Sequence, residues 1–128
     1  MADSILTLTF SDGLDISRYP EFQHAFATCP EGGSCVIIDL SAARWIDSIF
    51  MTELLLFYRK NQKLGRGTIL VAQGGVARML ALAGLDKRIR TVSDIDRALK
   101  ISQIERRRAR RQVGPPAGYE DLASSREE

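Results

Sequence analysis

The sequence has few cysteines and histidines, and this scarcity excludes two kinds of site. Its 128 residues include two cysteines, Cys29 and Cys35, and one histidine, His24. A disulfide framework needs several cysteine pairs, and a structural zinc site needs about four ligands, mostly thiolate or imidazole. We therefore expect both cysteines to be buried free thiols. We expect no metal ion and no cofactor.

The sequence also lacks a long apolar segment and a strong charge of one sign. No apolar run approaches the roughly 20 residues that cross a bilayer, and the N-terminus lacks the basic and apolar regions of a signal peptide. Eighteen basic and sixteen acidic side chains give a net charge of +2. That charge is too small to indicate nucleic acid or an acidic membrane as the main partner. With 45% hydrophobic residues, the chain can bury one core, so we expect one cytoplasmic domain.

Apolar runs typical of strands alternate with segments in which the apolar residues follow helical spacing. The sequence predicts strands at 5–10, 36–40, 68–72 and 89–92. It predicts helices at 21–27, 49–64, 76–83 and 93–101. Strands separated by helices need crossover connections. We therefore expect an α/β (α+β) fold with a mixed or parallel β-sheet and helices mainly on one face.

Asp47 and Ser48 lie at the junction between the strand at 36–40 and the helix at 49–64. A hydroxyl there can cap the free amides of the first helical turn, and a phosphate on it would face the positive end of the helix dipole. Ser48 is therefore either a switchable phosphorylation site or only the N-cap of this helix. Trp45, just before the loop, is expected to pack in the core or the loop, with a partner contact as the alternative.

The helix at 49–64 has an apolar stripe and a charged side. The stripe should face the sheet and contains Met51, Leu54, Leu55 and Tyr58, with Phe50 and Phe57 at its border. The other side carries charged residues together with Ile49, Thr52 and Leu56. Apolar side chains rimmed by charge are common at protein contacts. We therefore expect a partner interface on this side of the helix.

The composition changes after Ile104. We expect the domain to span residues 1–104 and to be followed, over 105–128, by a basic helix extension and a disordered tail. The arginine cluster at 106–111 is expected to be a solvated helix end, with contact to anionic lipid or nucleic acid as the alternative. Gly74 and Gly75 are expected to form a turn rather than a phosphate cradle, because no Lys-Ser/Thr pair follows them.

Three segments together resemble the STAS domain, the sulfate-transporter and anti-sigma-factor-antagonist family. They are Gly13-Leu14-Asp15, the strand and loop from Val36 to Ser48, and the helix end Leu80-Ala81-Leu82-Ala83-Gly84-Leu85. The resemblance covers residues 4–101 and implies a STAS-like single domain. Ile49 and Phe50 depart from the family pattern, which commonly has Ser or Thr and then Gly after the acceptor serine. Small scaffold subunits of stressosome complexes also resemble this pattern, with bulky apolar residues there.

In phosphoregulated members of that family, a partner kinase phosphorylates the serine after the loop aspartate, and the unmodified form binds the anti-sigma factor. The resemblance implies a bacterial anti-sigma factor antagonist that is not an enzyme, with an anti-sigma factor/serine-protein kinase and a phosphatase as partners. It makes Ser48 the acceptor. The expected partner-binding residues are Asp15, Asp47, Ser48, Ile49, Thr52 and Leu56. The alternative is a structural STAS subunit, either a stressosome-type scaffold or the small component of a lipid-transport ABC ATPase complex.

Overall fold

The structure is a computed structural model that describes residues 4–113, with side chains described through Glu105. Its main elements are β1 (Ile5–Leu14), α1 (Tyr19–Ala27), β2 (Cys35–Ile46), α2 (Ser48–Leu64), β3 (Gly67–Val71), α3 (Gly74–Leu82), β4 (Arg90–Val92) and α4 (Ile95–Val113). Two short 3-10 helices are η1 (Ile16–Arg18) and η2 (Leu85–Lys87). The tail predicted to be disordered begins at 114 and lies outside the described residues. No helix in the described range is long and apolar enough to cross a membrane.

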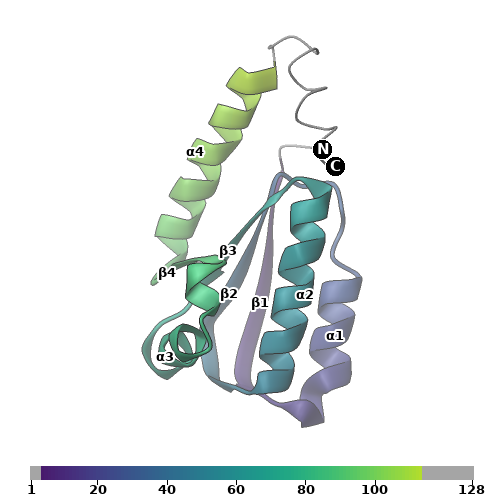
Figure 1. The fold of residues 1–128 in the computed structure, drawn as a ribbon, viewed down its shortest axis with the longest axis vertical. Helices are drawn as coiled ribbons and strands as arrows, with labels where there is room; N and C mark the ends of the chain where they lie inside the picture. The colour runs from purple at the N-terminus through teal and green to yellow at the C-terminus, as the bar shows by residue number, and fades with distance from the viewer. Residues whose placement is uncertain (1–3, 114–128) are drawn as a thin grey trace.

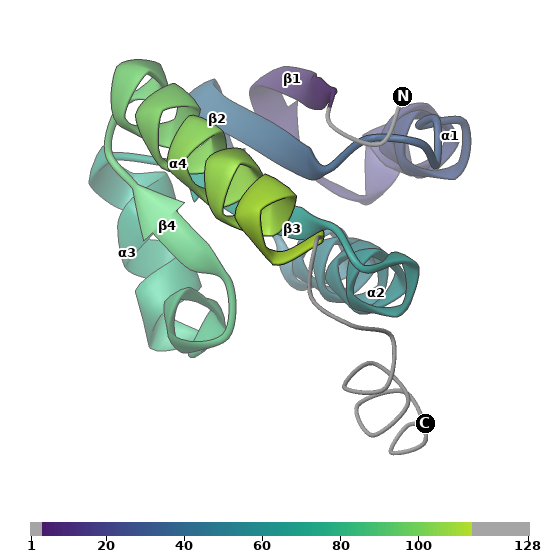
Figure 2. The same ribbon diagram turned by 90° about the horizontal axis from the view of Figure 1, so that it is seen from above.

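The four strands form one sheet in the order β1-β2-β3-β4, and every neighbouring pair is parallel (Figure 1). The predicted α/β class is confirmed, although the sheet is parallel throughout rather than mixed. Crossover connections between parallel strands are almost always right-handed. Each connection here leads to the next strand in the same direction across the sheet, so the helices α1, α2 and α3 all lie on one face. α4 follows the last strand and covers the opposite face, over β2, β3 and β4 (Figure 2).

Each face of the sheet packs against its own cluster of buried side chains. In the larger cluster, the ring centroid of Phe50 is 5.1 Å from that of Phe22, 5.4 Å from Phe10 and 5.9 Å from Phe26. The smaller cluster lies beneath α4 and contains Cys35, Ile37, Ile69, Val71, Val92 and Ala98. The helices on the two faces are therefore held by separate sets of apolar contacts.

The structure confirms the helix α2 but corrects its predicted phase. The fully buried row consists of Phe50, Leu54, Phe57 and Asn61. Met51, Leu55 and Tyr58 are only half-buried, so the prediction that they form the central stripe is wrong. The cause is α1, because its Phe26 ring packs 4.8 Å from the Phe57 ring and draws the buried side of α2 toward the neighbouring helix. Periodicity alone could not reveal that second contact.

β1 and β2 extend past the other two strands at their carboxyl ends. β3 ends at Val71, which pairs with Asp39 of β2, whereas β1 stays paired with β2 as far as Leu14 and Ile46. Two register shifts each place one extra residue in β2, and Asp12 has a φ of 63° beside them. Bulges of this kind bend a strand and increase its twist. The result is a two-stranded projection, residues 10–14 and 40–46, which we call the β1–β2 tip.

Both cysteines are buried free thiols, as predicted. Cys29 belongs to the larger core cluster and Cys35 to the smaller one, so they lie on opposite faces of the sheet. Burial raises the pKa of the Cys35 thiol to about 11. Cys35 therefore stays protonated near neutral pH.

A buried polar network ties the carboxyl end of α2 to β3. Asn61 is fully buried, and its Nδ2 donates a hydrogen bond to Thr68 Oγ1 at 2.8 Å. Arg66 Nε donates to Asn61 Oδ1 at 2.7 Å, and Arg66 Nη1 donates to the Pro30 carbonyl at 2.5 Å. These partners come from three separate segments, so hydrophobic patterning of the sequence did not predict the network.

Candidate functional site

Ser48 is the first residue of α2, directly after the β1–β2 tip. Asp47 is the N-cap of that helix, because its Oδ1 accepts a hydrogen bond from the Phe50 N–H at 3.0 Å. The alternative in which Ser48 is only the N-cap is therefore wrong. Aspartate and serine are about equally good caps, so the Asp-Ser pair did not reveal which one caps the helix. Ser48 is exposed, and within the described part of the chain its hydroxyl makes no hydrogen bond.

Asp15 lies beside Asp47, as the family resemblance implied. Leu14 and Ile46 are paired in the sheet, and the Asp47 N–H donates to the Leu14 carbonyl at 3.2 Å. Asp15 Oδ1 accepts hydrogen bonds from the hydroxyl and the N–H of Ser17, at 2.5 and 3.0 Å. These bonds, with smaller contributions from the Trp45 indole and the Arg18 charge, lower the pKa of the Asp15 carboxyl. The tip therefore keeps its carboxylate charge next to Ser48.

The exposed side of α2 continues from Ser48 along the helix. Thr52 is exposed one turn later, and its hydroxyl donates to the Ser48 carbonyl at 2.9 Å. Ile49 is 37% exposed and Leu56 is 52% exposed, which confirms the predicted surface positions. Leu56 borders a groove of about 160 Å³ between α1 and α2, which Phe26 also lines. Ser48, Thr52 and Leu56 thus follow one another at four-residue spacing, on one side of the helix.

Trp45 is half-exposed at the tip, so the expectation of core packing is wrong, whereas its indole does pack locally, beside the loop. It is 49% exposed on β2, and Ile16 of η1 is 61% exposed. The indole covers Gly13, where a Cβ atom would lie 2.2 Å from the ring atom Cζ2. The Arg44 guanidinium lies 5.9 Å from the centroid of the indole ring. The register shifts in β2 change which residues face outward, so strand alternation could not place Trp45; the glycine opposite it was the available signal.

Arg18 covers the free edge of β1 at the tip. Its Nη1 donates to the carbonyls of Ser11 and Gly13 at 2.6 and 2.8 Å. Its Nε and Nη2 donate to the two carboxylate oxygens of Glu21 at 3.0 and 2.6 Å. This pair raises the pKa of Arg18 and lowers that of Glu21. The guanidinium is therefore already engaged and does not neutralise a charge placed on Ser48.

The geometry offers a modifiable hydroxyl directly after the Asp47 carboxylate, with Asp15 following the strand paired to that segment. A phosphate on Ser48 would add about −1.5 to −2 charge, which the positive end of α2 favours and the carboxylates of Asp15 and Asp47 oppose. Among the described residues, no group of three or more His, Cys, Asp or Glu side chains is placed to hold a metal ion. The site thus combines a serine hydroxyl that can be phosphorylated with an exposed, partly apolar surface.

Comparisons with known proteins identify the family. The sequence model of the STAS domain matches residues 2–98. The structure is similar to an anti-sigma factor antagonist from Mycobacterium paratuberculosis, with 25% identity and a TM-score of 0.67 over 79% of this chain and 87% of that chain. It is similar to a sulfate transporter family protein from Wolinella succinogenes, with 16% identity and a TM-score of 0.70 over 78% and 85% of the two chains.

A third similar structure is the STAS domain of a SulP transporter from Vibrio cholerae, with 16% identity and a TM-score of 0.65 over 79% and 82% of the two chains. A comparison with curated protein sequences finds no match. The family match covers most of the chain and agrees with the observed sheet architecture. The chain belongs to the STAS domain family.

Proposed function

We propose that this chain is a non-enzymatic protein-binding domain that acts as an anti-sigma factor antagonist in the bacterial cytoplasm. Phosphorylation of Ser48 sets its affinity for an anti-sigma factor with serine kinase activity, and a phosphatase reverses the change. The observation that carries the proposal is the exposed, unbonded Ser48 hydroxyl at the first position of α2, directly after the Asp47 cap. The similarity to an anti-sigma factor antagonist supports this class of partner.

The switch works through local charge and desolvation. The unmodified protein binds its partner through Ser48, Ile49, Thr52 and Leu56, which lie on the exposed side of α2. A phosphate would have to be buried in that contact, and burying a charge without a counterion is costly. Arg18 is paired with Glu21, so its guanidinium is already engaged. Phosphorylation therefore weakens binding.

The similarity to transporter STAS domains supports a second candidate, a structural STAS subunit of a larger assembly. In that case Ser48 contributes to docking without switching it. Both candidates place Ser48 in the docking contact, but only the switch requires Ser48 to carry phosphate in the native protein. The phosphorylation state of Ser48, together with affinity measurements, therefore separates them.

Affinity capture from native lysate, followed by mass spectrometry, should identify the partner and report whether Ser48 carries phosphate. Binding of that partner is then measured for the wild type, Ser48→Ala, Ser48→Asp and the phosphorylated protein. We expect Ser48→Ala to retain the affinity, and both charged forms to weaken it by about tenfold or more. The control Gln103→Asp adds the same charge on α4, at an exposed position on the opposite face, and should bind normally. Equal affinities for all forms would rule out the switch and leave the structural role.

A further inference from the structure

β4 is the last strand of the sheet, and no described strand lies on its outer side. Leu70 of β3 pairs with Thr91, and the Ala72 N–H donates to the Val92 carbonyl at 3.0 Å. The Val92 carbonyl therefore points toward β3. Successive peptide groups along a strand point to alternate sides, so the N–H and the carbonyl of Thr91 point outward. The outer edge of β4 thus presents one backbone donor and one backbone acceptor.

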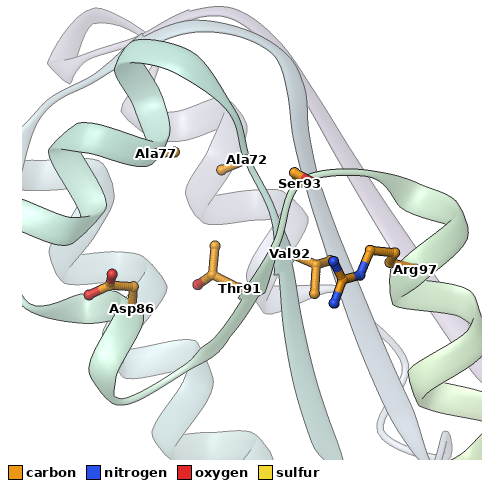
Figure 3. A pocket seen from close by; sticks show the side chains of 7 residues that line it. All are labelled: Ala72, Ala77, Asp86, Thr91, Val92, Ser93 and Arg97. Carbon is orange, nitrogen blue, oxygen red and sulfur yellow. The ribbon is translucent and has the colours of Figure 1, made fainter.

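A trough follows this outer edge. A cavity of about 370 Å³ lies at its carboxyl end, where Figure 3 shows Thr91 between Asp86 and Arg97. A second cavity of about 540 Å³ lies toward the amino end and is also lined by Asp86 and Thr91. The two cavities share these two lining residues, so both open beside β4. We call them together the β4 trough.

The topology explains why the β4 trough opens here. β3 leads into α3 on one face of the sheet, whereas β4 leads into α4 on the other face (Figure 2). Where neighbouring strands send their connections to opposite faces, a crevice forms at their carboxyl ends. Ala72 and Ala77 line this end, and their small side chains leave the crevice unfilled.

The side chains along the β4 trough are mainly basic. Lys87, Arg88, Arg90 and Arg97 line it and are exposed. Two acidic side chains, Asp86 and Glu105, also line it. Glu105 is paired with Arg90 at 3.5 Å. Lys87, Arg88 and Arg97 form no ion pair with any described residue. The trough therefore carries a net positive charge along an unpaired strand edge.

We propose that the β4 trough binds a short, extended, acidic peptide segment of a partner protein. The segment adds as a strand beside β4, exchanging two backbone hydrogen bonds with Thr91 while its carboxylates face the basic side chains. Charge complementarity selects an acidic segment rather than a neutral one. No residue of the trough belongs to the Ser48 site, so this activity is independent of the phosphorylation switch.

Fluorescence anisotropy with a labelled acidic peptide, acetyl-TEVEVET-amide, tests the proposal on the full chain. We expect saturable binding that weakens at high salt. The uncharged analogue TQVQVQT should bind about tenfold more weakly, because three exposed ion pairs are lost. The double variant Arg88→Gln/Arg97→Gln should bind the acidic peptide more weakly. The matched double variant Arg59→Gln/Lys63→Gln, at exposed positions on α2, should bind it normally.

A backbone substitution tests strand addition separately. Thr91→Pro removes the outward N–H, and an edge strand tolerates proline where its nitrogen faces away from the sheet. It also removes the hydroxyl that donates to the Ile89 carbonyl at 3.0 Å, so Thr91→Val is the control that loses the hydroxyl and keeps the N–H. We expect binding about tenfold weaker for Thr91→Pro and nearly unchanged for Thr91→Val. In the wild type, the peptide should slow hydrogen exchange of the Thr91 amide, a measurement that needs no variant.

Each contrary outcome overturns a defined part of the proposal. Equal binding of the charged and uncharged peptides overturns the acidic specificity. Normal binding by Thr91→Pro together with an unprotected Thr91 amide overturns strand addition. Absence of binding overturns the proposal, and the basic side chains then only prevent the β4 edge from pairing with other strands. Much tighter binding by a chain that lacks residues 114–128 shows that the occupant is this chain's own acidic segment, not a partner's. None of these results depends on phosphorylation of Ser48.

Discussion

Removal of the Asp47 side chain should destabilise the protein, whereas removal of the Ser48 hydroxyl should not. Asp47 accepts the hydrogen bond from the Phe50 N–H, and the Phe50 side chain is fully buried. Loss of an N-cap costs about 1 kcal/mol, and loss of a carboxylate at a helix N-terminus costs about 0.3–1 kcal/mol more. Asp47→Ala should therefore lose about 1–2 kcal/mol, which lowers the Tm of a domain of about 100 residues by roughly 4–16 °C.

Thermal and urea unfolding followed by circular dichroism measure this difference. Ser48→Ala should change the free energy of unfolding by less than about 0.5 kcal/mol, because its hydroxyl is exposed and unbonded. Asp47→Asn is the control that keeps an acceptor and removes the charge, so it should lose less than Asp47→Ala. Equal losses in Asp47→Ala and Ser48→Ala would refute the assignment of the cap to Asp47. They would also indicate that the Ser48 hydroxyl helps to cap α2.

Three further predictions concern the core. Phe50→Ala should cost about 3–5 kcal/mol of unfolding free energy in a urea titration, because the ring is fully buried. Its surface neighbour Ile49→Glu should cost less than about 0.5 kcal/mol in the same titration, and a large loss there would contradict the observed phase of α2. Arg66→Met should cost about 1–3 kcal/mol by calorimetry, because the buried Asn61 side-chain oxygen and the partly buried Pro30 carbonyl lose their donor, and unchanged stability would argue against that cause. Cys35 should react with iodoacetamide far more slowly than an exposed thiol at neutral pH, because its pKa is about 11; rapid labelling in the folded state would contradict its burial.

The sequence alone determined the order and type of the main elements. Strand-like runs and helical spacing report which residues are buried, and burial is the dominant favourable term in folding. The same local information placed Ser48 at the start of a helix and Ile49 and Leu56 on its exposed side. It also indicated two buried thiols, because isolated cysteines pack as small apolar groups. These features depend on neighbours that are close in the chain.

Tertiary structure decided the features that depend on distant residues. The contact between α1 and α2 set the phase of α2, and the register shifts between β1 and β2 built the tip and exposed Trp45. Both Asp47 and Ser48 could cap a helix, and the pairing of Leu14 with Ile46 fixed the geometry in which Asp47 does so. The β4 trough exists because successive helices leave β3 and β4 toward opposite faces. Local spacing does not encode these relations, because they follow from pairing and packing between segments far apart in the sequence.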